Sequence, residues 1–162
     1  MSLYCLTGPL RVGKSFLLEQ LARHRALHIP RWHSVKPVRN LFVEQITPAA
    51  LAVNVTADCY ELIDSDLYGT YFLPRTSLRS DSITLVVMSL EAALRWRKER
   101  AVQIIYILPD PDYRRRTTNK AWKDHRDHPL TKSQLAQTTY QLELTNPTNK
   151  TVWELESILF DR

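Results

Sequence analysis

The chain has 162 residues, of which 44% are hydrophobic and 24% charged, so we expect one folded domain with a sizeable core and exclude a disordered chain. Its formal net charge is +5, which fits either lysines and arginines that line a phosphate site or a polyanionic partner such as DNA or RNA. No apolar run is long enough to cross a bilayer, so we expect no membrane partner. Cys5 and Cys59 lie far apart in the sequence, and we expect reduced thiols and a cytoplasmic location.

The most informative feature stands near the start of the chain. Residues 8–15 read Gly-Pro-Leu-Arg-Val-Gly-Lys-Ser, a complete G-x-x-x-x-G-K-S phosphate-binding loop. An apolar run at 2–7 predicts a strand before it, and the apolar periodicity that follows predicts a helix over 14–24. Successive backbone N–H groups of such a loop, together with the helix N-terminus, form an anion-binding concavity.

This motif predicts binding of ATP and Mg²⁺. Lys14 supplies a positive charge for the β- and γ-phosphates, and the Ser15 hydroxyl is the candidate metal ligand. The full set of expected ATP-binding positions in this segment is Gly8, Pro9, Leu10, Arg11, Val12, Gly13, Lys14, Ser15 and Phe16.

Strand-like and helix-like segments alternate along the rest of the chain. We expect a short strand over 26–34, a helix from Thr47-Pro48 to about residue 54, and extended segments at 60–63 and 71–73. Continuous apolar runs at 82–88 and 101–108 predict strands buried on both faces, with a helix capped by Ser89 between them. A helix at 131–138, a strand at 140–145 and an amphipathic helix at 151–160 complete the pattern.

This alternation predicts a three-layer α/β/α P-loop NTPase fold with a central parallel sheet. Ligands in such folds sit at the carboxyl ends of the strands. The phosphate-binding loop, Ser89, Pro109 and Asn146 all follow predicted strands, so we expect them near one edge of the sheet.

The order of these parts resembles the guanylate-kinase-like nucleoside monophosphate kinases. After the first helix, Lys36-Pro37-Val38-Arg39 has the charge spacing of the family's R-x-x-R phosphate grip. Phe42-Val43 and the helix from Thr47 follow as in the family, and then Glu61 and Tyr68-Gly69 stand at the places of its acidic residue and Tyr-Gly pair. Arg114, Arg115 and Arg116 fall where the family's arginine-bearing lid begins.

The resemblance implies a single kinase domain over 1–162, with a core at 1–34 and 82–162, an acceptor-binding region at about 35–81 and a basic lid at about 110–130. It implies an ATP-dependent phosphotransferase that acts on a nucleotide-type acceptor. Asn146 would lie beside the nucleotide base, and the arginines of the lid would stabilise the transferring phosphoryl group. The implied acceptor-binding residues are Ser34, Lys36, Arg39, Glu61, Tyr68 and Gly69.

Three departures from the family pattern, one of which is the basic excess of this chain, keep other functions open. The segment between Arg39 and Phe42 is short, and the strand ending at Ser89 lacks the family's acidic residue, which leaves Mg²⁺ to Ser15, phosphates, water or Glu91. If the acceptor is instead a hydroxyl on nucleic acid or on a modified base in DNA, a carboxylate should take its proton, and Asp64 and Asp66 are the candidates.

A third reading is a nucleotide-binding module without transferase activity. The missing acidic residue is the feature that favours it. Trp32 and Trp122 lie in basic segments and are candidates for stacking on a base. The sequence does not fix the oligomeric state.

Overall fold

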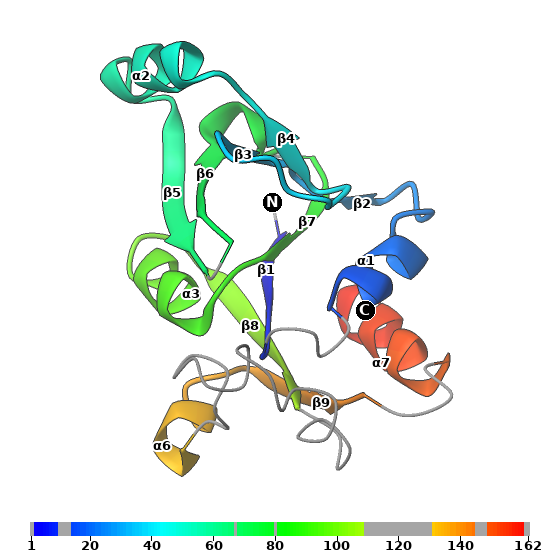
Figure 1. Ribbon diagram of the computed structural model, residues 1–162. Helices are drawn as coiled ribbons and strands as arrows, with labels where there is room; N and C mark the ends of the chain where they lie inside the picture. Colours follow the sequence, from blue (N-terminus) through cyan, green and yellow to red (C-terminus); the bar gives the residue numbers. More distant parts are fainter. Residues whose placement is uncertain are drawn as a thin grey trace.

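The computed structural model describes residues 2–9, 14–66, 68–79, 81–108, 131–144 and 149–160. These residues form two sheets and their covering helices (Figure 1). The elements are β1 (Ser2–Thr7), α1 (Lys14–Leu21), β2 (Leu27–His28), β3 (Trp32–Ser34), β4 (Val43–Gln45), α2 (Pro48–Thr56), β5 (Tyr60–Ser65), β6 (Thr70–Pro74), β7 (Ile83–Val87), α3 (Leu90–Arg97), β8 (Val102–Leu108), α6 (Lys132–Leu135), β9 (Tyr140–Glu143) and α7 (Asn149–Phe160).

The main sheet has five strands in the order β2-β7-β1-β8-β9, and every pair in it is parallel. β1 lies in the middle, with Leu3 beside both Thr84 of β7 and Val102 of β8. The apolar runs of β7 and β8 are explained by this position, because a central parallel strand is covered on both faces. The strand that precedes the phosphate-binding loop is therefore the middle strand of the sheet, with a paired strand on each side.

Helices cover both faces of the main sheet. On one face, α1 and α7 pack against alternate strand residues such as Tyr4 and Leu6. On the other face, α3 packs against Leu3 and Cys5 through Trp96 and its neighbours. Alternate residues of β1 therefore pack into two different hydrophobic cores, one on each face of the sheet. The predicted three-layer α/β/α arrangement is confirmed.

The second sheet has four strands in the order β4-β3-β6-β5. It corrects one prediction, because the single strand expected over 26–34 is divided between the two sheets. β2 ends at His28 and pairs with β7, whereas β3 begins at Trp32 and pairs with β4 and β6. Pro30 lies between them and has no N–H with which to continue a ladder.

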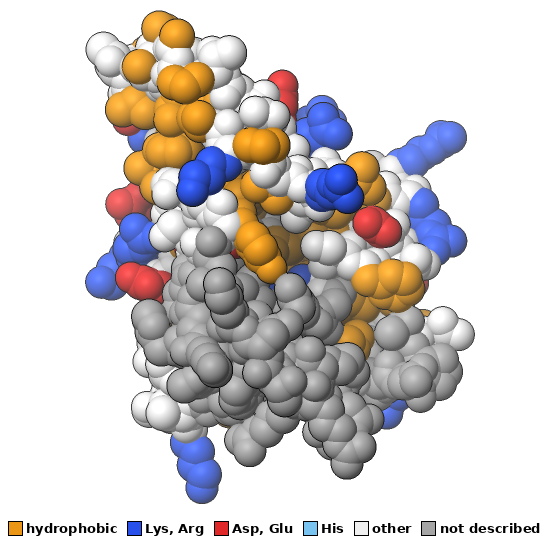
Figure 2. Space-filling view, viewed as in Figure 1, with side chains coloured by type: hydrophobic (Ala, Val, Ile, Leu, Met, Phe, Trp, Pro, Cys, Tyr) orange, Lys and Arg blue, Asp and Glu red, His pale blue; other side chains and the backbone are white. Residues whose placement is uncertain are grey.

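α2 lies at the outer end of the second sheet. Thr47 caps the helix by accepting a hydrogen bond from the Ala50 N–H, and Pro48 occupies the first turn, as the sequence predicts. None of its residues is buried. Figure 2 shows hydrophobic side chains over this part of the molecule. Val53 and Val55 of this helix are exposed. Among the described residues, no helix is long and apolar enough to cross a membrane.

Candidate active site

The described ends of the phosphate-binding loop meet at the carboxyl end of β1. The Lys14 ammonium, in the first turn of α1, donates hydrogen bonds to the carbonyl oxygens of Gly8 (2.5 Å) and Pro9 (2.8 Å). Gly8, Lys14 and Ser15 all line one pocket. Lys14 therefore lies at the carboxyl end of the central strand, beside the space that a ligand would occupy.

This pocket has a volume of about 630 Å³ and lies between the main sheet and the second sheet. Its floor is the carboxyl edge of the main sheet, where Thr7 ends β1 and Ser89 follows β7. This is the position at which open α/β sheets bind their ligands. In Figure 2 the surface is hollowed between the second sheet and α1.

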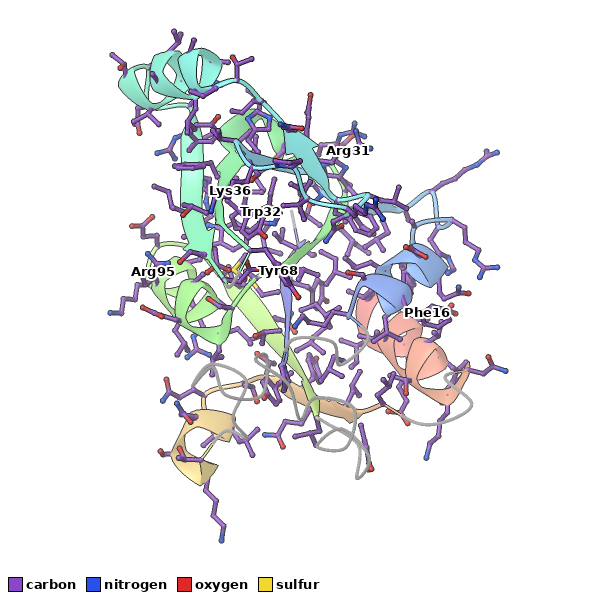
Figure 3. The ribbon with its side chains drawn as sticks, viewed as in Figure 1. Phe16, Arg31, Trp32, Lys36, Tyr68 and Arg95 are labelled. Atoms are coloured by element: carbon purple, nitrogen blue, oxygen red, sulfur yellow. The ribbon has the colours of Figure 1, made fainter. Side chains whose placement is uncertain are left out.

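Aromatic and apolar side chains from the second sheet and from the segments that flank β3 form the opposite wall of the pocket. The lining residues on this wall are Ile29, Pro30, Trp32, Asn40, Phe42, Val43 and Tyr71. Apolar walls that carry aromatic side chains suit a nucleobase or another planar ring. Trp32 is largely buried and lies in the region between the two sheets (Figure 3).

Asp64 ties the second sheet to the start of α3. Its carboxylate accepts hydrogen bonds from the Ser89 N–H (2.7 Å) and the Ser89 hydroxyl (2.8 Å). The Ser89 Oγ also accepts from the Ala92 N–H and so caps α3, as predicted. The sequence shows no acidic residue at the end of β7, but the fold brings a carboxylate to that place from β5.

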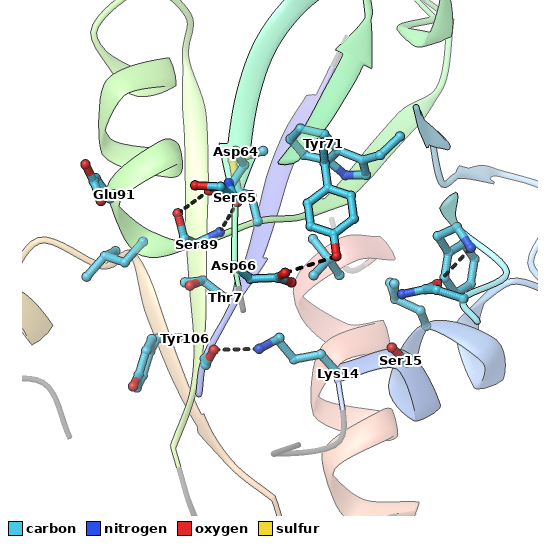
Figure 4. Close-up of a pocket in the computed structure, with 18 of the residues that line it drawn as sticks. Thr7, Lys14, Ser15, Asp64, Ser65, Asp66, Tyr71, Ser89, Glu91 and Tyr106 are labelled. Carbon is cyan, nitrogen blue, oxygen red and sulfur yellow. Dashed lines mark hydrogen bonds between the residues drawn. The ribbon is translucent and has the colours of Figure 1, made fainter. Parts of the chain in front are cut away.

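Asp66 is held by the turn between β5 and β6. Its Oδ1 accepts hydrogen bonds from the N–H groups of Tyr68 (2.7 Å) and Gly69 (3.2 Å) and from the Tyr71 hydroxyl (3.0 Å). Burial and the neighbouring Asp66 carboxylate raise the pKa of Tyr71, so its phenol remains a proton donor in this pair. Figure 4 shows the Asp66 carboxylate directed into the pocket, between Tyr71 and Lys14.

The oxygen atoms that line the pocket fit Mg²⁺ held together with phosphates. Ser15, Asp64 and Glu91 all contribute to its lining, and Mg²⁺ is usually bound by one or two carboxylates, substrate phosphates and water. Within the described residues, no group of three or more histidine, cysteine, aspartate or glutamate side chains forms a metal cage.

Several residues expected to hold the acceptor lie beside the pocket and do not line it. Lys36 and Arg39 are exposed, and the Lys36 stem lies next to Gly69. Ser34 is buried and its hydroxyl donates to the Lys36 carbonyl. Tyr68 lies at the tip of the β5–β6 turn (Figure 3), and its side chain is 49% exposed.

Glu61 occupies a different place from the one the family resemblance implies. Its side chain is 2% exposed and is bonded to Arg75 (2.7 Å), to Arg100 and to the indole N–H of Trp96 (2.9 Å). Burial alone would raise the pKa of Glu61, but the hydrogen bonds from Arg100 and Trp96 outweigh it and lower the pKa. Because Glu61 does not line the pocket, we assign it to the junction between β5 and α3.

Other predicted site residues lie outside the described part of the chain. These are Leu10, Arg11, Val12, Gly13, Arg114, Arg115, Arg116 and Asn146, together with Trp122 and the lid segment as a whole. Phe16 is described, is 46% exposed and does not line the pocket.

The structure also places in the pocket residues that were not singled out as site residues. Asn40, Tyr71 and Tyr106 line it, yet none of them belongs to a recognisable motif. Phe42 also lines the pocket, although the sequence indicated it only as part of the family resemblance, without a site role. Tyr71 lies on β6 and Tyr106 on β8, whereas Asn40 lies between β3 and β4. No local sequence pattern links these three residues, because only the folding of the chain brings them to one pocket.

Comparison with known proteins identifies the fold. No family model matches the sequence, and no curated protein sequence matches it. Among solved structures, the chain is similar to the guanylate kinase from Anaplasma phagocytophilum, with a TM-score of 0.71 and 14% sequence identity over 98% of this chain and 84% of the other. The chain therefore has a guanylate-kinase-like fold, as the order of its motifs suggested.

Proposed function

We propose that this protein is an ATP-dependent phosphotransferase that moves the γ-phosphoryl group to a nucleotide-type acceptor. The observation that carries the proposal is a single pocket with two chemically different ends. Lys14 and Ser15 lie on one side of it, and Asp64, Asp66 and the aromatic side chain of Tyr71 lie on the other (Figure 4). A donor and an acceptor bound in this pocket would be held side by side, which is the main requirement for phosphoryl transfer.

At the donor end, ATP would bind with its phosphates against the loop amides and the Lys14 ammonium. Its Mg²⁺ would be held by Ser15 and the phosphates, with Asp64 reached through water. Arg114, Arg115 and Arg116 are proposed to close over the phosphates, and Asn146 is proposed to lie near the base.

At the acceptor end, two reacting groups are compatible with a nucleotide-type acceptor. The guanylate-kinase-like fold favours the phosphate of a nucleoside monophosphate as the reacting group. Lys36 and Arg39, which do not line the pocket, would have to reach this phosphate from the pocket's edge. The carboxylates that line the pocket support a hydroxyl group, for which a general base is needed. Both belong to the same class of reaction.

The experiment is a transfer assay with γ-labelled ATP, Mg²⁺ and the full chain. Nucleoside monophosphates, nucleosides, oligonucleotides with a free 5′-hydroxyl and DNA with a hydroxylated base are offered in parallel. We expect label in at least one acceptor, and we expect Lys14→Ala to lower the rate by about 100-fold or more. Lys98→Ala, an exposed lysine at the end of α3, is the matched control.

Two results would overturn parts of this proposal. Transfer by Lys14→Ala at the wild-type rate would remove Lys14 from the mechanism. Binding of ATP and Mg²⁺ by the wild-type chain, with no transfer to any acceptor, would favour a nucleotide-binding module over a transferase.

A further inference from the structure

The acceptor end of the pocket presents an oriented carboxylate to the donor end. Asp66 and Lys14 line the same pocket, and Figure 4 shows the Asp66 carboxylate directed toward its interior. Trp32, Phe42 and Tyr71, which belong to the aromatic wall described above, line the same pocket. A molecule stacked on this wall would have its reacting group near both Asp66 and the phosphate-binding loop.

Asp66 is held rigidly while one of its oxygens remains open to a new partner. All three of its hydrogen-bond donors, two backbone N–H groups and the Tyr71 hydroxyl, bind Oδ1. Within the described residues, none donates to Oδ2. A base must be oriented by groups other than its substrate and still have a free lone pair, and Asp66 meets both conditions.

Asp64 differs from Asp66 in this respect. Both of its carboxylate oxygens accept hydrogen bonds from Ser89 at the start of α3. Its geometry is that of a residue that fixes β5 against α3, and it does not leave an oxygen comparable to Oδ2 of Asp66. The two carboxylates therefore have different roles, although the sequence presents them as an equivalent pair.

The sign of the charge also distinguishes the two kinds of acceptor. An ionised carboxylate repels a phosphate dianion by about 4 kcal/mol per pair of unit charges at 4 Å near a protein surface. The same carboxylate accepts a hydrogen bond from a neutral hydroxyl. Asp66 thus favours an alcohol over a phosphomonoester at this end of the pocket.

We propose that Asp66 is the catalytic base of this site and that the acceptor is a hydroxyl group on a nucleoside, either free or within a nucleic acid. This inference rests on the proposed phosphotransferase function. The acceptor oxygen forms a bond to the γ-phosphorus as its proton passes to Oδ2 of Asp66. The bond from that phosphorus to the bridging oxygen breaks, and ADP leaves with the electron pair. Asp66 then releases the proton to water.

The test compares Asp66→Asn with wild type in the labelled-ATP assay. Asparagine keeps an oxygen for the Tyr68 and Gly69 N–H groups and loses the basic oxygen, so the turn should still form. We expect the rate of transfer to a hydroxyl acceptor to fall by about 10²- to 10⁴-fold while the dissociation constant for ATP stays within about twofold. Asp81→Asn, an exposed residue outside the pocket, should match the wild-type rate.

A further measurement distinguishes a hydroxyl acceptor from a phosphate acceptor. The chemical nature of the wild-type product is informative even if the variant does not fold. Label in a new phosphomonoester supports the inference, and label in a nucleoside diphosphate contradicts it, because the ADP released from γ-labelled ATP carries no label.

The outcomes for the two proposals are distinct. If the wild-type chain phosphorylates nucleoside monophosphates and Asp66→Asn retains that rate, the inference about Asp66 is wrong and the phosphotransferase function stands. If the wild-type chain does not bind ATP, both proposals fail. Label in free nucleosides, in oligonucleotides or in both identifies the source of the hydroxyl.

Discussion

The main sheet and the second sheet differ in how their positions are fixed. The main sheet lies between two apolar layers, and the residues of its central strands, such as Leu6, Leu85 and Ile104, are fully buried. The second sheet also contributes Trp32 and Leu73 to a core, but its strand β5 is joined to α3 through directed polar bonds. These run from Glu61 to Trp96 and Arg100, from the Ile63 carbonyl to Arg95, and from Asp64 to Ser89.

This difference matters for function because each sheet carries one end of the pocket. Apolar packing has little directional preference, so the donor end depends on the overall packing of β1 and α1. Hydrogen bonds and ion pairs impose distance and angle, so the acceptor end is oriented by a few named contacts. Substitutions in the two regions should consequently have different effects.

The largest expected effect is on the packing of the main sheet. Leu85→Ala removes a fully buried side chain from β7 and should lower the free energy of unfolding by about 2–5 kcal/mol. Leu41→Ala makes the same chemical change at a position that is 63% exposed and should change it by less than about 0.5 kcal/mol. Urea denaturation measures both, and equal losses would contradict this account of the core.

The second effect is on the junction between β5 and α3. Glu61→Gln leaves Arg75 and Arg100 without their buried carboxylate and should cost about 1–3 kcal/mol at neutral pH. Glu19→Gln, an exposed change on α1, is the control. A loss confined to Glu61→Gln would support the polar junction.

The comparison of wild type with Glu61→Gln also predicts how the free energy of unfolding depends on pH. The pKa of Glu61 is lower in the folded protein than in the unfolded chain, so its contribution to stability is present above the unfolded value of about 4.3. It is lost as the pH falls through the lower folded pKa. The difference in unfolding free energy between wild type and Glu61→Gln should therefore shrink on acidification, and a constant difference would contradict the assigned role.

The smallest effect concerns two helix caps. Ser89→Ala and Thr47→Ala each remove a capping hydroxyl, which is worth about 0.5–2 kcal/mol. Ser89 also donates to Asp64, whereas Thr47 caps the exposed helix α2. We therefore expect the melting temperature to fall more for Ser89→Ala, and the opposite order would show that the Asp64 contact adds nothing.

The parts of the fold that could be predicted from the sequence depend on local patterns. The apolar runs of β7 and β8, the capping residues Thr47 and Ser89 and the loop motif before Lys14 each specify structure within a few neighbouring residues. The end of α1 was less well predicted, since the helix stops at Leu21 rather than at about residue 24.

The candidate site was predicted only in part because its geometry is not local. Nothing near Glu61 in sequence indicates that Trp96 and Arg100 bind its carboxylate, and nothing near Asp64 indicates its bond to Ser89, which is 25 residues away. The division of segment 26–34 between two sheets likewise depends on pairing partners that lie far along the chain.

The central claim is that the loop around Lys14 binds the phosphates of a nucleoside triphosphate. Calorimetric titration of the full chain with ATP and Mg²⁺ tests it most directly. The account predicts saturable binding by the wild-type chain and by Lys98→Ala, with affinity at least about tenfold weaker for Lys14→Ala because a charge-assisted contact of about 1.5–3 kcal/mol is lost. No heat at millimolar ATP, or equal binding by wild type and Lys14→Ala, would contradict it.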